Sequence, residues 1–119
     1  MIVLTSRGGE VGIAAAMETL RAGGTALDAV EAAARLVEAD PTNHTVGVSG
    51  WPNLLGQAEL DASIMDGRTR ASGAVGALQG YRHPISLARQ VLERLPHVLL
   101  VGEGAARFAA EVGAETAEL

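Results

Sequence analysis

Residues 59–67, with the sequence ELDASIMDG, restrict the local structure more than any other part of the chain. Apolar and polar side chains alternate along this stretch, as they do in a strand with one buried face. The Asp66-Gly67 pair that ends it is typical of a type I′ turn, whose two central residues need positive φ. The stretch therefore predicts a β-hairpin, with a return strand over residues 68–77.

The segments around the hairpin carry helical and short apolar patterns. Gly23-Gly24 supplies a stop for the first helix, and Thr25 with Asp28 predicts a capping box at the start of the second. This alternation favours a layered α/β (α+β) architecture with an antiparallel component. The remaining elements expected are a buried strand at 2–4, a short apolar strand at 98–101 and helices at 10–21, 25–40, 84–95 and 103–112.

Composition limits the classes of function. The chain has 119 residues, a net charge of −5 and no cysteine, and its arginines are spread along the sequence rather than clustered. A nucleic-acid interface needs a basic face, so we expect no nucleic-acid partner. The chain shows no secretory signal pattern and no apolar run near the roughly 20 residues of a membrane helix, so we expect a cytoplasmic protein.

The hairpin also contains the first candidates for chemistry. Glu59, Asp61 and Ser63 share one face of the predicted strand, with about 7 Å between alternate residues. Two carboxylates at that spacing can do acid–base work on a glycoside. The favoured interpretation is structural, because Arg68 and Arg70 are expected on the opposite strand, close enough to neutralise the acids.

Other motifs are weaker. Residues 101–109, VGEGAARFA, lack the third glycine and the Lys-Ser/Thr pair of phosphate-binding loops, so an ordinary strand-to-helix turn is expected. His44, His83 and His97 have no spacing typical of a metal site, and none is predicted. A Ser-His-Asp triad stays an open alternative because folding assembles triads from distant residues, although no G-x-S-x-G is present.

Four stretches in a fixed order resemble a known family. They are GGTALDAVEAAARLVEADPT at 23–42, ELDASIMDG at 59–67, GAVGAL at 73–78 and HPISLARQVLERLPHVLLVGEGAARFA at 83–109. Together they are similar to the α chain of the asparaginase and glycosylasparaginase family of N-terminal-nucleophile hydrolases. Several long motifs in register are far more specific than one short pattern.

The resemblance implies that residues 1–119 are a single partial domain, the α-chain half of a four-layer αββα sandwich. A β chain from the same precursor completes it after autoproteolysis and carries the threonine nucleophile, whose own α-amino group is the base. The sequence contains no GTIG or DTIG, which agrees with a nucleophile on that partner. An (αβ)2 heterotetramer is expected. No cofactor is required, and a structural sodium ion on main-chain carbonyls of residues 37–47 is an option.

The resemblance also marks four residues near the active site. Ser6 matches a hydroxyl residue at the end of the first strand, and Thr45 matches a hydroxyl residue that orients the nucleophile. Arg7 occupies a position where glycosylasparaginases have a tryptophan that walls the substrate pocket. Trp51 is an alternative aromatic wall, although a buried loop anchor is the favoured interpretation.

The expected function is therefore that of the α subunit of an amidohydrolase of the glycosylasparaginase or L-asparaginase type. Its substrate is a small amino-acid amide with an asparagine-type side chain, and the reaction passes through an acyl-enzyme. One alternative is a plant-type asparaginase with β-aspartyl peptidase activity. An alternative of another class is a catalytically inactive binding or assembly module.

Overall fold

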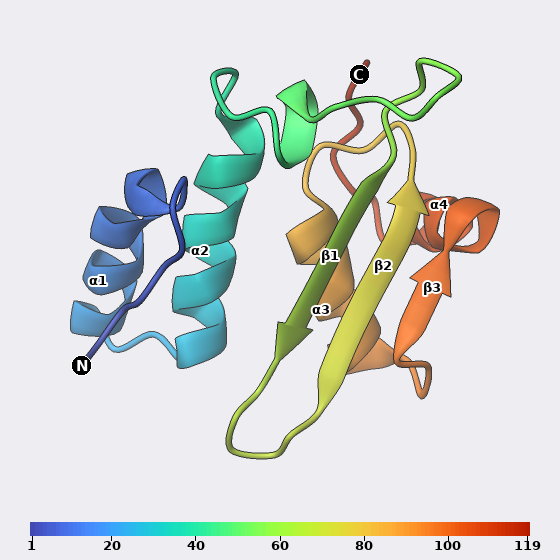
Figure 1. The fold of residues 1–119 in the computed structure, drawn as a ribbon. Helices are drawn as coiled ribbons and strands as arrows, with labels where there is room; N and C mark the ends of the chain where they lie inside the picture. The colour runs from blue at the N-terminus through green and yellow to red at the C-terminus, as the bar shows by residue number, and fades with distance from the viewer.

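The structure is a computed structural model that describes residues 1–119. It has two parts: a helix pair flanked by the amino-terminal segment, and a three-stranded sheet with helices on one side (Figure 1). The predicted mixed α/β architecture with an antiparallel strand pair is confirmed. No helix is both long enough and apolar enough to cross a membrane.

The helix pair consists of α1 (Ile13–Arg21), preceded by a short 3-10 helix (Glu10–Gly12), and α2 (Ala26–Ala39). The predicted capping box starts α2. The Asp28 N–H donates to Thr25 Oγ1 at 3.1 Å, and the Thr25 N–H donates to the Asp28 carboxylate at 2.8 Å. These two bonds satisfy backbone donors that a helix start leaves free.

The sheet contains β1 (Leu60–Met65), β2 (Ser72–Leu78) and β3 (Leu99–Val101) in that spatial order. β1 and β2 are antiparallel, as predicted, and β3 is parallel to β2. The connection from β2 to β3 passes through α3 (Pro84–Arg94), and α4 (Gly102–Glu111) follows β3 directly.

The hairpin turn is longer than predicted. Residues 66–71 form the loop, closed by the Asp66 N–H donating to the Ala71 carbonyl at 2.9 Å. Positive φ falls on Arg70, at 61°, and not on the Asp66-Gly67 pair. The prediction that Arg68 and Arg70 face the acids across the ladder is therefore wrong. The Asp66 carboxylate accepts the Arg68 N–H at 2.9 Å, which forms an Asx turn at this position. This turn takes the place of the predicted two-residue turn.

The hydrophobic core lies between the sheet and the helices α3 and α4. Its fully buried members include Val75, Leu78, Leu87 and Val91. α3 lies so close to β2 that a Cβ atom on Gly73 would overlap the carbonyl oxygen of Ala88. Glycine at this position therefore sets the distance between helix and sheet.

Polar contacts between α2 and α3 help to join the two parts of the fold. Arg89 pairs with Asp28 at 2.7 Å and with Glu31 at 2.8 Å. The Ser86 hydroxyl donates to Glu31 Oε1 at 2.6 Å, and Arg35 donates to Ser86 Oγ at 2.8 Å. This network holds α2 against α3 while β1 remains at the edge of the sheet.

The predicted first strand over residues 2–4 is wrong for this chain. No backbone group of residues 2–5 is hydrogen-bonded to another backbone group, and Ile2 and Leu4 are 81% and 90% exposed. The segment runs beside the helix pair without meeting the sheet (Figure 1). An apolar run forms a strand only where a neighbouring strand supplies the ladder, and no strand of this chain lies beside it.

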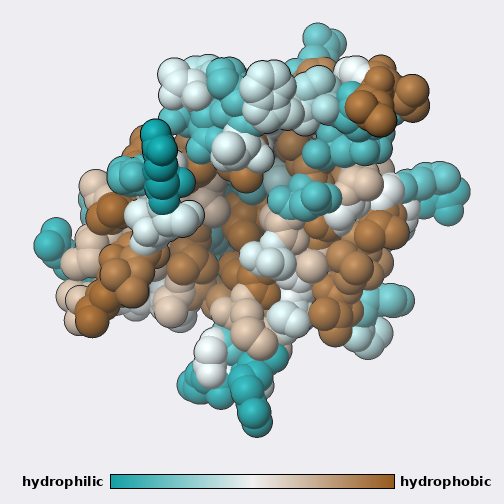
Figure 2. All heavy atoms as spheres, in the orientation of Figure 1, coloured by the Kyte–Doolittle hydropathy of each residue, from teal (hydrophilic) through white to brown (hydrophobic).

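The face of the sheet opposite α3 and α4 is uncovered. Met65, Leu99 and Val101 are 59%, 55% and 57% exposed there, beside the small residues Ala74 and Gly76. Figure 2 views the molecule from this side, and brown hydrophobic atoms appear over much of the sheet. A sheet that carries apolar side chains on both faces is typical of an inner layer rather than of an outer one.

Candidate functional site

A groove of about 470 Å³ separates the helix pair from the edge of the sheet. Residues of the amino-terminal segment, α1 and α2 form one wall, and β1 contributes the other. Most of the lining is apolar and includes Ile2, Leu4, Ile13, Leu20, Val30 and Val37. The groove therefore lies between two backbone segments that lack partners on this side, namely residues 2–5 and β1.

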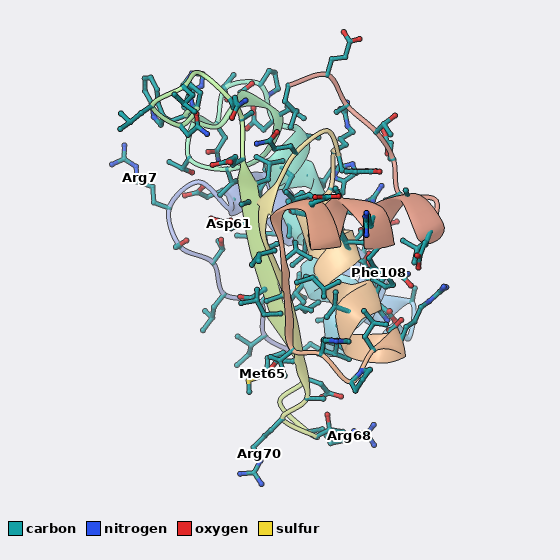
Figure 3. All side chains as sticks on the ribbon, turned by 90° about the vertical axis from the view of Figure 1, so that its right-hand side faces the viewer. Arg7, Asp61, Met65, Arg68, Arg70 and Phe108 are labelled. Carbon is teal, nitrogen blue, oxygen red and sulfur yellow. The ribbon has the colours of Figure 1, made fainter.

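Polar side chains also line the groove. Ser6, Arg7, Thr45 and Asp61, here called the polar group of the groove, come from three separate segments of the chain. Three of the four predicted site residues, Ser6, Arg7 and Thr45, thus line one cavity, although what they do there stays a prediction. Figure 3 shows Arg7 and Asp61 at the same end of the molecule, away from Met65 and the hairpin loop.

Thr45 is held by Asn43, a residue that the sequence patterns did not single out. Asn43 Oδ1 accepts the Thr45 N–H at 2.9 Å and the Thr45 hydroxyl at 2.6 Å. Because the hydroxyl has only one proton, it presents lone pairs to any further group. Thr45 can therefore accept a hydrogen bond from a neighbouring hydroxyl or ammonium donor.

Asn43 also touches the turn that carries Arg7. The Gly9 N–H donates to the Ser6 carbonyl at 3.1 Å, and Gly8 has a φ of 93°. A Cβ atom on Gly8 would lie 3.4 Å from Asn43 Nδ2. The turn over residues 6–9 is thus packed against the residue that orients Thr45, which brings Arg7 into the neighbourhood of Thr45.

Trp51 does not line the groove. Its side chain is 79% exposed, so the predicted buried loop anchor is wrong. The indole lies 5.9 Å from the His44 ring, with the planes tilted by 54°, and the His44 ring is itself fixed by a 2.9 Å contact with the Ser49 carbonyl. Both rings belong to an exposed loop, which no other element of this chain covers.

Asp61 lies opposite an irregularity in the sheet. The pairing of β1 with β2 shifts between Leu60 and Ala62, and Ala77 has a φ of 49° at this point. The Ala77 N–H donates to Asp61 Oδ1 at 2.8 Å. Asp61 thus has a backbone partner, whereas Glu59 pairs with the Gln79 side-chain amide at 3.0 Å. The carboxylate stabilises a bulge whose extra N–H has no partner in the ladder.

Glu38 is a second carboxylic acid of the groove, and sequence reasoning missed it. It is only 5% exposed, its Oε1 accepts the Ile85 N–H at 2.9 Å, and its Oε2 lies 3.1 Å from His83 Nδ1. Burial raises the pKa of Glu38 to about 7, against the lowering effects of the Ile85 N–H and Arg35. Burial lowers the pKa of His83 most, and the positive charge of Arg35 lowers it further.

The available signal for Glu38 was its place in the helical pattern. It follows Ala34 by one helical turn, so it continues the apolar stripe of α2 into the interior. No group of three or more histidine, cysteine, aspartate or glutamate side chains is arranged to hold a metal ion.

Comparison with known proteins shows the family of this chain. The sequence profile of the asparaginase family (Asparaginase_2) matches residues 8–119. The chain is 49% identical over 98 residues to an N(4)-(β-N-acetylglucosaminyl)-L-asparaginase of Elizabethkingia miricola, covering 82% of this chain and 28% of that protein. It is 49% identical over 94 residues to an isoaspartyl peptidase/L-asparaginase of Homo sapiens, covering 79% and 30%.

A third relative is a plant-type L-asparaginase of Thermococcus kodakarensis, 47% identical over 92 residues, covering 77% of this chain and 30% of that protein. The chain thus spans less than a third of the length of these relatives. The profile match extends over nearly the whole chain, and the identities are high over most of it. The chain therefore belongs to the asparaginase family.

Proposed function

We propose that this chain is the α part of an N-terminal-nucleophile amidohydrolase that cleaves the side-chain amide of asparagine-type substrates. The observation that carries the proposal is the polar group of the groove. Ser6 and Thr45 come from distant parts of the sequence and line the same groove, beside Arg7. Relatives named as glycosylasparaginase and as isoaspartyl peptidase/L-asparaginase support this class of reaction.

The same proposal accounts for the two incomplete surfaces of the fold. Further strands from the rest of the protein would pair with residues 2–5 and with β1, where backbone groups lack partners, and would leave the polar group accessible to substrate. A second sheet would cover the apolar face around Leu99 and Val101. The result is the four-layer αββα sandwich, shared between α and β chains that assemble as (αβ)2.

In this proposal the β chain begins with a threonine that attacks the amide carbon. The threonine's own α-amino group is the base, and its covalent closeness to the hydroxyl avoids the entropic cost of bringing in a separate base. Thr45 already donates its proton to Asn43, so it accepts a hydrogen bond from the hydroxyl or amine of the nucleophile. Its role is to orient, and Ser6 stands beside it in the groove.

A structural sodium ion remains part of the proposal, and the loop over residues 37–47 fits it. The main-chain carbonyls of Pro41, Thr42 and Asn43 accept no backbone N–H, so oxygen ligands of the kind that hard cations take are available. These residues would hold the ion. It would rigidify the loop that carries Thr45.

The test uses the extended protein, meaning residues 1–119 together with the coding sequence that follows Leu119. We expect mass spectrometry to find cleavage before a threonine and the processed protein to release aspartate from asparagine, β-aspartyl-leucine or N-acetylglucosaminyl-asparagine. The 119 residues alone are expected to be inactive. Turnover by these residues alone would contradict the assignment of the nucleophile to a partner.

The competing hypothesis is an inactive binding or assembly module. The coding sequence after Leu119 separates the two: a Thr-Ile-Gly-like segment favours the enzyme, and the absence of any such segment favours the module. A cleaved, folded protein that hydrolyses none of the three amides would reject the enzyme.

A further inference from the structure

We infer that Arg7 selects substrates whose departing amine carries a carboxylate, which makes β-aspartyl dipeptides the preferred class. This inference rests on the proposed function and deepens it. In the reaction, the threonine hydroxyl attacks the side-chain carbonyl carbon, the C–N bond breaks, and the amine leaves with a proton. Water then hydrolyses the ester, which releases aspartate and restores the threonine. The departing amine is the part of the substrate that Arg7 would recognise.

Arg7 is the one basic side chain among the residues that line the groove. It lies in the polar group beside Ser6 and Thr45, where the proposed function puts the reacting amide. Figure 3 shows its side chain projecting on the side of the sheet away from α3 and α4, which is the side on which Asp61 lies. A ligand held at the polar group would therefore meet a positive charge there.

The guanidinium of Arg7 has no partner within the chain. The ion pairs of the structure use Arg35, Arg82, Arg89 and Arg107, and Arg7 takes part in none of them. The acid nearest in sequence, Glu10, instead accepts the Gly8 N–H at 2.7 Å. In a chain with a net charge of −5, a groove-lining cation without a partner is available to an anionic ligand.

The backbone that carries Arg7 is fixed even though the side chain is exposed. The turn over residues 6–9 is closed by the hydrogen bond from the Gly9 N–H to the Ser6 carbonyl. A Cβ atom on Gly9 would overlap Thr5 Oγ1, and one on Gly8 would touch Asn43. Because Asn43 also orients Thr45, the backbone that carries Arg7 and the Thr45 hydroxyl are held in a constant relation.

The three candidate amides differ in what they offer to a guanidinium. Asparagine releases ammonia, which has no further group, and a glycosylated asparagine releases a neutral sugar amine. A β-aspartyl dipeptide releases an amino acid, whose carboxylate matches the planar fork of arginine in charge and geometry. Arg7 would therefore contribute more to the turnover of the dipeptide than to that of asparagine.

The experiment measures kcat/KM of the extended protein for β-aspartyl-leucine, β-aspartyl-leucinamide, asparagine and N-acetylglucosaminyl-asparagine. The leucinamide removes only the carboxylate of the departing amine. We expect the unmodified enzyme to prefer β-aspartyl-leucine over its amide by roughly 10- to 100-fold, the range for one charge-assisted contact. Arg7→Gln should abolish that preference and Arg7→Lys should retain part of it, and in both variants asparagine should lose less turnover than β-aspartyl-leucine.

Arg68→Gln is the matched control, because Arg68 is another exposed arginine without an ion pair, in the hairpin loop at the opposite end from Arg7 (Figure 3). It should leave all four activities unchanged. Equal loss on asparagine and on β-aspartyl-leucine in Arg7→Gln would overturn the inference, as would a preference of the unmodified enzyme for the glycosylated substrate. If a processed protein hydrolyses none of the four amides, the proposed function itself fails, and this inference fails with it.

Discussion

Glu38 is a carboxyl group buried between α2 and the start of α3, with His83 and the Ile85 N–H as its contacts. Its environment includes Arg35 and Glu31, which act on its charge in opposite directions. Burial outweighs these effects and raises its pKa from the ordinary 4.5 to about 7. A carboxyl group next to the groove thus changes its charge near neutral pH, with consequences for stability.

We predict that Glu38→Gln makes the extended protein more stable above pH 7 and leaves its stability at pH 4 unchanged. Between pH 4.5 and about 7 the unfolded state loses the Glu38 proton while the folded state retains it, so stability falls as pH rises. The full difference is about 3 kcal/mol, and glutamine avoids it while keeping an acceptor for the Ile85 N–H.

The measurement is Tm of both proteins from pH 4 to pH 8.5. Because His83 Nδ1 contacts the Glu38 carboxyl at 3.1 Å, Glu38→Gln also changes the titration of His83, and the difference between the two proteins reports this coupled pair. A difference in Tm that stays constant over this range would contradict the prediction.

Asn43 offers a second prediction, which concerns rate. Asn43→Ala frees the Thr45 hydroxyl to rotate, so we expect kcat of the extended enzyme to fall roughly 10-fold, the effect of losing one orienting hydrogen bond. KM should change little, because in the proposal Thr45 orients the nucleophile and not the substrate. Asn43→Asp keeps an acceptor and should recover part of kcat.

Asn53→Ala is the control for this prediction. Asn53 Oδ1 also accepts two loop N–H groups, those of Leu55 and Gln57, at 2.9 and 3.0 Å, but it does not line the groove. Steady-state kinetics should separate the two variants. A change in KM alone, or an equal fall in kcat for both variants, would refute the orienting role of Asn43.

Close packing between elements of secondary structure depends on glycines, which have no side chain, at the points of contact. α3 lies against β2 at Gly73, and the 3-10 helix before α1 approaches α2 at Gly12, where a Cβ atom would come within 2.7 Å of Ala33 Cβ. At such points the backbone of one element occupies the space that a methyl group would need. Close-packed interiors do not absorb added volume without strain.

We predict that Gly73→Ala destabilises the extended protein by about 2 kcal/mol or more, because the methyl group pushes α3 away from the sheet. Gly104→Ala is the matched control: it lies within α4 and its added Cβ atom would meet nothing within 4 Å. We expect that change to be neutral or to stabilise by up to about 1 kcal/mol through helix propensity. Denaturant unfolding of both variants measures the contrast, and similar midpoints would disprove it.

Two surfaces of the molecule expose apolar side chains of the kind found in protein interiors. They are the groove and the open face of the sheet. Both adjoin β1, the edge strand next to the groove. In the proposed sandwich they become buried by strands of the β chain. A substitution on the open face should therefore act as a core substitution in the extended protein, although it looks like a surface change here.

We predict that Leu99→Asp lowers Tm of the extended protein by several degrees or prevents its processing, because it buries a charge between two sheets. Leu36→Asp changes a comparably exposed leucine of α2 that lines neither the groove nor the sheet, and we expect it to have little effect. Similar Tm values for the two variants would argue against a second sheet on this face.

The amino-acid sequence predicted the structural features that depend on residues close together in the chain. The capping box at Thr25, the stop at Gly23-Gly24 and the pairing of β1 with β2 depend on residues a few positions apart, or on an alternation that only a strand satisfies. The family followed from long motifs in order, which the profile match confirms.

Long-range features needed the folded chain. Burial of Glu38 beside His83, the contact of Asn43 with the turn at Gly8, and the common groove of Arg7 and Thr45 join residues whose distance in space no local pattern specifies. Residues 2–4 show the same limit, because an apolar run becomes a strand only when a neighbour offers its backbone. Local propensity acts over one turn or one hairpin, whereas a site is assembled by packing between elements.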